Sequence, residues 1–138
     1  MTRRIFFTLA AAALVLAAAN HPALAQTESL SLSTFKIPFD FIAHGKTFTA
    51  GQYSLNANME GEILTLQPLG TKGPAAMLPV ETRLAERKVL PEPELVFDKV
   101  NGKLYLSELY VPGEDGYLVM ATKGPHTHET VKGSKKKS

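Results

Sequence analysis

Hydrophobic and polar residues alternate along much of the chain, which is the pattern of half-buried β-strands. In residues 35–41 the apolar side chains occupy every second position, and Lys36, Pro38 and Asp40 lie between them. Successive side chains of a strand point to opposite faces, so the apolar ones share one face. Because Pro38 has no amide hydrogen, we expect this strand at a sheet edge, or with the Pro38 nitrogen facing out of the ladder.

Further strands are predicted where short apolar runs lie between turn residues. The expected strands cover residues 53–55, 63–69, 75–80, 95–100, 103–111 and 117–122. Their spacing of about ten residues is typical of all-β proteins. Residues 81–94 are the least strand-like stretch, and residues 82–89 could form one or two turns of helix before Pro91.

Asn101-Gly102 is the strongest local signal in the chain. An Asn-Gly pair between two apolar runs favours a two-residue type I′ hairpin turn, because both positions need a positive φ angle. A two-residue turn also fixes the register of the strands that it joins. The predicted register places Phe97 opposite Leu106, and Leu95 opposite Glu108.

These elements predict an all-β protein of six to seven strands. The two architectures that fit are a small antiparallel β-sandwich and a partly open β-barrel. Two predicted strands carry continuous apolar runs, at Leu95–Phe97 and Leu118–Met120, so both of their faces need cover. The cover could come from the 81–94 segment, from a second subunit in a homodimer, or from a ligand.

The first 25 residues have the pattern of a secretory signal peptide. Arg3-Arg4 precedes an apolar run over residues 5–19, and Ala23-Leu24-Ala25 supplies a cleavage pattern before Gln26. Sec and twin-arginine export both stay open, because paired arginines serve in either signal. Either route predicts a periplasmic or secreted protein. We expect its β-domain in residues 26–123 and a basic, disordered tail in residues 124–138.

Composition and charge remove several functional classes. The chain has no cysteine, which excludes disulfides, thiolate metal sites and thiol catalysis. Its formal net charge of +2 depends on its two ends, because between Gln26 and Val131 acidic residues outnumber basic ones 13 to 9. Nucleic-acid binding is therefore not expected, since it requires a basic face on the folded domain.

His126 and His128 form the pair with the spacing of metal ligands. Residues two apart in an extended chain point to the same side, so both imidazoles could reach one ion. Glu129 points to the opposite side from His128, and the pair lies in the predicted tail. We therefore expect a solvated pair that holds no structural metal ion, and name His126 and His128 as the metal candidates.

No other group of residues has catalytic spacing. Asp40, Asp98 and Glu108 are the carboxylates of predicted strands, and Ser107 lies beside Glu108 without a neighbouring histidine. His44 lies in a predicted turn, where an exposed polar residue is expected. The sequence therefore predicts no catalytic residue, no cofactor and no enzymatic activity.

A set of short motifs runs along residues 35–125. They are Ile37-Pro38-Phe39-Asp40-Phe41, Gly45-Lys46, an Ala-Gly-x-Tyr turn at residues 50–53, Leu104–Glu108 and Gly116–Val119. In these motifs the chain resembles a group of small, uncharacterised secreted proteins that are frequent in acidobacterial genomes. The group often has proline where this chain has Thr49, which leaves the turn less rigid. The resemblance implies no known activity, cofactor or site residue.

The function that we expect is that of an exported, non-catalytic β-domain serving as an envelope-associated binding or structural module. The alternative is a carrier of small apolar ligands with a pocket inside a barrel. A protein, an envelope polymer and a small apolar ligand all stay open as partners. An interior cavity lined by phenylalanines would favour the carrier, whereas a filled core would favour the module.

Overall fold

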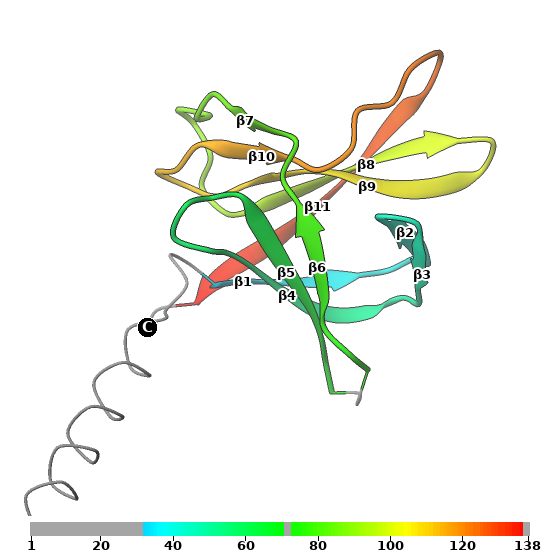
Figure 1. Ribbon diagram of the computed structural model, residues 1–138, viewed down its shortest axis with the longest axis horizontal. Helices are drawn as coiled ribbons and strands as arrows, with labels where there is room; N and C mark the ends of the chain where they lie inside the picture. The colour runs from blue at the N-terminus through cyan, green and yellow to red at the C-terminus, as the bar shows by residue number, and fades with distance from the viewer. Residues whose placement is uncertain (1–31, 71–72, 137–138) are drawn as a thin grey trace, which may run out of the picture.

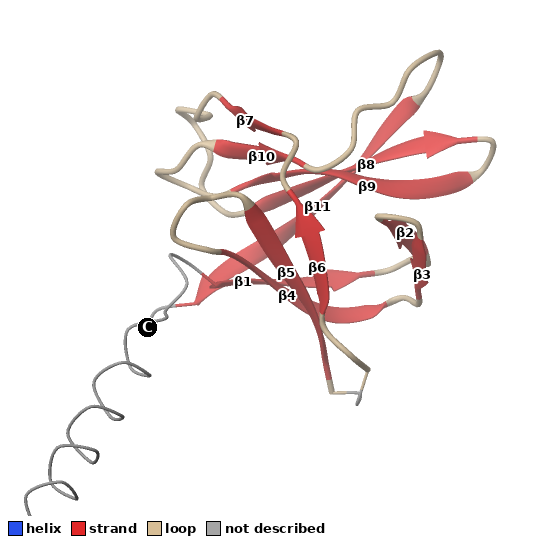
Figure 2. Cartoon of the chain, viewed as in Figure 1, coloured by secondary structure: helices blue, strands red, loops and turns tan. Residues whose placement is uncertain are grey.

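The computed structural model describes residues 32–70 and 73–136. They form an all-β fold with 59% strand and no helix (Figures 1 and 2). Eleven strands make one curled, open sheet with the shape of a half-barrel. The expected all-β class is confirmed, although six to seven strands is an undercount. The predicted signal peptide, residues 1–25, lies outside the described residues, among which no helix is long and apolar enough to cross a membrane.

The strands are short and follow one another with few residues between them. Their bounds are β1 (Leu32–Ile37), β2 (Phe41–Ala43), β3 (Lys46–Phe48), β4 (Gly51–Ala57), β5 (Ile63–Leu69), β6 (Ala76–Pro79), β7 (Thr82–Leu84), β8 (Glu94–Val100), β9 (Lys103–Tyr110), β10 (Gly116–Leu118) and β11 (Thr127–Lys136). Their order in the sheet is β3-β2-β9-β8-β11-β1-β4-β5-β6, and β10 pairs with both β9 and β7. Neighbours are antiparallel except β2 and β9, which share one parallel bridge.

β1 ends directly before Pro38 and lies in the interior of the sheet. It pairs with β11 on one side and with β4 on the other. Proline cannot donate the amide hydrogen bond that a central strand needs, so the strand stops at Ile37. The prediction of one edge strand running through Pro38 is therefore wrong, and the chain bends there before it continues as β2.

The hairpin of β8 and β9 has the predicted turn. Asn101 and Gly102 have φ angles of 52° and 79°, both in the left-handed region that a type I′ turn requires. Phe97 pairs with Leu106, as the two-residue turn predicts. The turn type and the register next to it are confirmed.

A β-bulge between Val96 and Phe97 changes the far half of this hairpin. Beyond the bulge Leu95 pairs with Leu109, and not with Glu108 as predicted. A bulge inserts one extra residue into one strand and so changes which face the residues beyond it occupy. Here the extra residue is Ser107 of β9, so Leu106 and Leu109 both face the core, opposite Phe97 and Leu95.

The prediction of a disordered tail at residues 124–138 is wrong. Residues 127–136 form β11, which pairs with β8 on one side and β1 on the other. Val131 is buried in the core, and Gly133 lies against the ring of Phe35. A central strand satisfies its backbone through both neighbours, so it can form with few apolar side chains of its own. The β-domain therefore extends to Lys136.

The core lies on the concave side of the curled sheet and contains apolar side chains from most of its strands. A chain of aromatic contacts runs through it, with ring centroids of neighbouring pairs 5.0 to 6.1 Å apart. Edge-to-face and offset contacts at these distances stabilise a core beyond the burial of apolar area. The rings that make this chain are Phe39, Phe97, Phe41, Phe48 and Tyr53.

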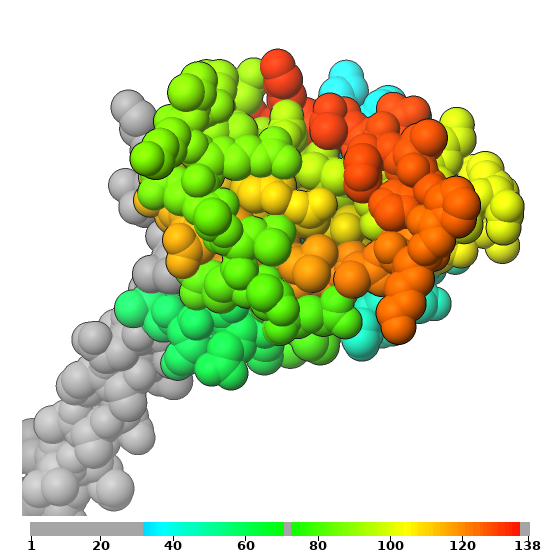
Figure 3. Space-filling view, turned by 90° about the horizontal axis from the view of Figure 1, so that it is seen from above, coloured from blue at the N-terminus to red at the C-terminus, as the bar shows by residue number. Residues whose placement is uncertain are grey.

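The 81–94 segment lies against tyrosine rings of β9 and β10. It contains β7, which pairs with β10, so the alternative of a short helix at residues 82–89 is wrong. Arg83 lies over the ring of Tyr117 at 4.8 Å, and Arg87 lies over the ring of Tyr110 at 3.7 Å. Figure 3 shows this green segment beside the gold residues of β9 and β10. The chain itself therefore covers these two tyrosine rings.

Candidate functional site

Asp98, His126 and His128 lie together on one face of the sheet. Asp98 is in β8, and the backbone pairing places His128 of β11 directly opposite it. His128 Nδ1 is 2.9 Å from Asp98 Oδ1, and His126 Nε2 is 4.0 Å from the same oxygen. The two imidazole rings meet edge to face with centroids 4.9 Å apart. The three side chains therefore form a compact group, which we call the His–Asp cluster.

The His–Asp cluster has a buried side and an exposed side. Asp98 is only 2% exposed, while the side chains of His126 and His128 are 20% and 53% exposed. Figure 3 shows the orange residues before and at the start of β11 beside the yellow β8–β9 hairpin. A buried carboxylate needs polar partners, and the imidazole of His128 is one.

The structure corrects the expected surroundings of the histidine pair. The pair is not part of a disordered tail, because His126 immediately precedes β11 and His128 lies within it. Asp98 adds a carboxylate, a third side chain that can bind a metal ion, to the two histidines. The spacing of residues in the sequence did not reveal this neighbour. Glu129 is aligned with Phe97 and not with Asp98. Only the long-range pairing of β8 and β11 brings the cluster together.

The other candidate polar residues have local structural partners. Asp40 accepts a hydrogen bond from the backbone N–H of Ala50 at 2.9 Å. The hydroxyl of Ser107 donates to a backbone carbonyl in the loop after β10 at 2.7 Å. Glu108 accepts a hydrogen bond from the hydroxyl of Tyr110. His44 is exposed in the turn between β2 and β3, as expected.

Tyr110 and Tyr117 lie under the 81–94 segment with raised pKa values. Burial raises the pKa of Tyr110 above its ordinary value of 10.0, and the hydrogen bond to Glu108 raises it further. Burial also raises the pKa of Tyr117, with a second contribution from the charge of Glu114. Both phenols therefore remain protonated at neutral pH and contribute packing and hydrogen bonds.

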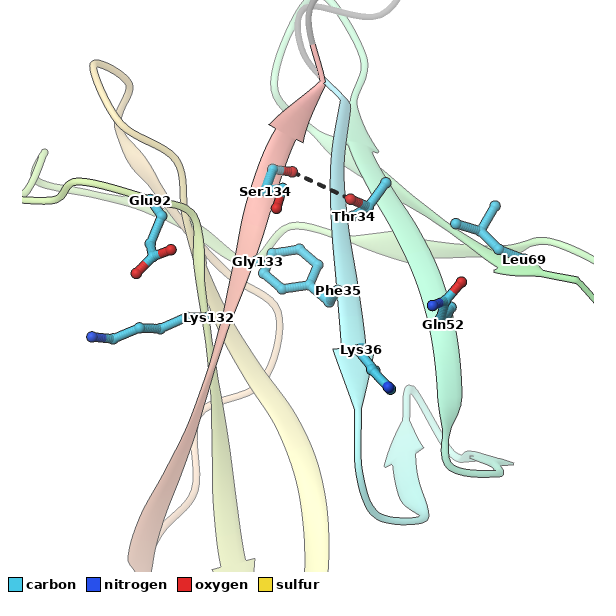
Figure 4. Close-up of a pocket in the computed structure, with 9 residues that line it drawn as sticks. All are labelled: Thr34, Phe35, Lys36, Gln52, Leu69, Glu92, Lys132, Gly133 and Ser134. Carbon is cyan, nitrogen blue, oxygen red and sulfur yellow. Dashed lines mark hydrogen bonds between the residues drawn. The ribbon is translucent and has the colours of Figure 1, made fainter.

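A polar groove of about 440 Å³ crosses the outer surface of β11, β1, β4 and β5 (Figure 4). Cross-strand pairs align Thr34 with Ser134, and Gln52 with both Lys36 and Leu69. Paired residues lie on the same face of a sheet, so these side chains share one surface. Lys132 and Glu92 complete the border of this surface, which we call the polar groove.

A second, more apolar hollow of about 340 Å³ lies near β3 and the start of β4. Phe48 is half-buried there, and Tyr53 is buried behind it. Pro68 and Pro74 border the other side. This apolar pocket has the size and lining of a small-ligand site.

Comparisons with protein families, curated proteins and solved structures found no match to this chain. The polar groove, the apolar pocket and the His–Asp cluster are three separate surface features of the described residues.

Proposed function

We propose that the protein is an exported, non-catalytic β-domain that acts as a binding module of the cell envelope, in the periplasm or outside the cell. Its contact surface in this proposal is the polar groove, and its partner is a hydroxyl-rich envelope polymer. The observation that carries the proposal is the alignment of polar side chains across three neighbouring strands, β11, β1 and β4.

The chemistry of the polar groove suits a polymer with hydroxyl and carboxylate groups. Gln52 offers both a donor and an acceptor, and the ammonium groups of Lys36 and Lys132 donate to oxygen atoms. Thr34 and Ser134 add hydroxyl groups between them. These three strands span about 10 Å, so more than one unit of a linear chain can contact the surface at once. A long row of modest polar contacts favours a polymer over a small compact ligand.

Two further features support a non-catalytic, exported module. Two of the sequence candidates for catalysis, Asp40 and Ser107, form hydrogen bonds with the backbone. The first 25 residues have the n-region, apolar run and cleavage pattern of an export signal. A small exported domain in which these two groups serve the fold fits a binding role.

Co-sedimentation of the purified protein with peptidoglycan sacculi tests this proposal. A Gln52→Ala/Lys132→Ala double variant removes two exposed polar contacts and should weaken binding about tenfold or more, since one hydrogen bond contributes about 1 kcal/mol. Lys103→Ala, in the β8–β9 hairpin, is the matched control and should bind as the parent does. Absence of binding by the parent, or equal binding by the double variant, would reject the polar groove as the contact surface.

The apolar pocket favours a second candidate function, the carriage of a small apolar ligand. Phe48, Tyr53 and the two prolines provide apolar contacts around its volume. The phenylalanine rings of the core pack against one another, which supports the module over a carrier with a hollow interior. A fluorescent apolar probe such as anilinonaphthalene sulfonate tests the carrier. Saturable binding that Phe48→Ala abolishes, with sacculus binding absent, would replace the first proposal with this one.

A further inference from the structure

We propose that Asp98, His126 and His128 form a binding site for one divalent transition-metal ion, such as Zn²⁺. Asp98 lies in β8, His128 in the neighbouring strand β11, and His126 directly before β11 (Figure 1). Its donor atoms all lie within 4.8 Å of one another. This proposal goes beyond the binding of a polymer and does not depend on it, because none of the three residues borders the polar groove.

The hydrogen bonding of His126 prepares one ring nitrogen for a metal. His126 Nδ1 is 2.8 Å from the backbone carbonyl oxygen of Gly124. A carbonyl oxygen only accepts hydrogen bonds, so Nδ1 carries the proton and, in the neutral ring, Nε2 keeps its lone pair. That Nε2 atom is the one nearest Asp98. Metal-bound histidines are typically held in this way, with the second ring nitrogen donating to a carbonyl or a carboxylate.

The separations between donor atoms in the His–Asp cluster lie on either side of the ligand–ligand separation in a tetrahedral zinc site. Zinc binds imidazole nitrogen and carboxylate oxygen at about 2.0–2.2 Å, which places tetrahedral ligands about 3.4 Å apart. The cluster has separations of 2.9 Å from His128 Nδ1 and 4.0 Å from His126 Nε2 to the Asp98 oxygen. These two separations differ from that value by about 0.5 Å and 0.6 Å, and all donor atoms lie within 4.8 Å of one another. The ion would then replace the hydrogen bond between His128 and Asp98.

The proposed site has a buried carboxylate on one side and partly exposed imidazoles on the other. Asp98 is held in the middle of a central strand and is 2% exposed, so its carboxylate has little water to solvate it. A divalent cation compensates such a charge more strongly than a neutral imidazole does. Both imidazoles face the solvent side, where an ion can enter and a water molecule can complete its coordination. Three protein ligands with an open position are typical of an accessible zinc site rather than of a closed structural one.

The donor set also selects the class of metal. Two imidazoles and one carboxylate suit zinc, copper, nickel and cobalt, whereas calcium and magnesium prefer sites made of oxygen atoms alone. We therefore expect binding of Zn²⁺ and Co²⁺ and no competition from a large excess of Mg²⁺.

Calorimetric titration of Zn²⁺ into metal-free purified protein tests the site. We expect one ion per chain, and His126→Ala should weaken the affinity at least about tenfold, since even the loss of a supporting residue around a metal costs that much. His44→Asn is the matched control, because it removes an exposed histidine from the turn between β2 and β3, outside the His–Asp cluster, and it should leave the affinity unchanged. Equal affinity in His126→Ala, or an equal loss in His44→Asn, would overturn the proposal.

Cobalt absorption gives a second measurement that does not depend on folding energetics. Co²⁺ bound by two imidazoles and a carboxylate in four-coordinate geometry should give intense visible bands, which Zn²⁺ displaces. Asp98→Asn should remove these bands while circular dichroism reports whether the sheet is still folded. Persistence of the same bands in a folded Asp98→Asn protein would exclude the carboxylate as a ligand and overturn the three-residue site.

Discussion

Gly102 occupies a backbone conformation that its neighbours in β8 and β9 do not share. Its φ angle of 79° lies in the left-handed region, where a β-branched side chain is strained. Gly102→Val should therefore destabilise the fold by about 1–2 kcal/mol. Urea denaturation monitored by circular dichroism measures this change. Lys103→Val, one residue later in the strand, is the control and should have a much smaller effect, and an unchanged midpoint for Gly102→Val would argue against the type I′ turn.

Ser33 is a polar residue in an apolar position of β1. Its side chain is fully buried, and its hydroxyl oxygen has no hydrogen-bond partner among the described residues. Because a buried hydroxyl without a partner costs free energy, Ser33→Ala should stabilise the protein by about 1 kcal/mol. Ser107→Ala provides the contrast, since it removes a hydroxyl that donates a hydrogen bond at 2.7 Å, and it should destabilise by a similar amount. Thermal unfolding of both variants measures the two signs, and a loss of stability in Ser33→Ala would contradict the first.

At the scale of elements, the sequence predicted the features that depend on residues close together in the chain. The Asn101-Gly102 turn and the adjacent register depend on a few neighbouring residues, and both were predictable from the sequence. β11 was not, because its partners β8 and β1 lie about thirty and one hundred residues away, respectively, and its own side chains are mostly polar. The grouping of the His–Asp cluster could not be predicted from the sequence for the same reason. His126, His128 and Asp98 were each visible as candidates, but only the β8–β11 pairing joins them.

Gly133 lies in β11 directly opposite Phe35 of β1, where there is no room for a side chain. A Cβ atom at this position would lie 2.4 Å from the carbonyl oxygen of Thr34 and 2.5 Å from the ring of Phe35. Neither the backbone nor the buried ring can move freely, so Gly133→Ala should destabilise the protein by about 1–3 kcal/mol. Chemical denaturation measures the loss, and Ser134→Ala, at the next and exposed position, is the matched control. Equal stability of the two variants would mean that β11 does not pack on β1 as described.

At the scale of the whole chain, the N-terminal pattern predicts processing during export. When the protein is expressed in a bacterium and recovered from the periplasm, its mass should correspond to a chain that begins at Gln26. Ala25→Leu places a large residue at the cleavage site and should block this processing. Replacement of Arg3 and Arg4 by lysines separates the two export routes, since the twin-arginine route needs both arginines. Recovery of the parent still beginning at Met1 would indicate an N-terminal anchor and contradict cleavage.

The alkaline stability of the molecule should depend on the two tyrosines under the 81–94 segment. Burial raises the pKa of Tyr110 and of Tyr117 above 10.0, so the folded protein keeps these phenol protons at a pH where the unfolded chain has begun to release them. The folded state then binds more protons than the unfolded state, and the free energy of unfolding decreases as the pH rises. The stabilisation is complete below pH 10 and is lost as the pH rises through the raised pKa values, with each tenfold difference in proton affinity contributing about 1.4 kcal/mol. Urea denaturation from pH 8 to 11.5 measures this dependence.

A Tyr110→Phe/Tyr117→Phe variant keeps both rings but has no phenol protons at these positions, so its stability should fall less steeply above pH 10. Parallel curves for the parent and the variant would show that these two phenols do not control alkaline unfolding.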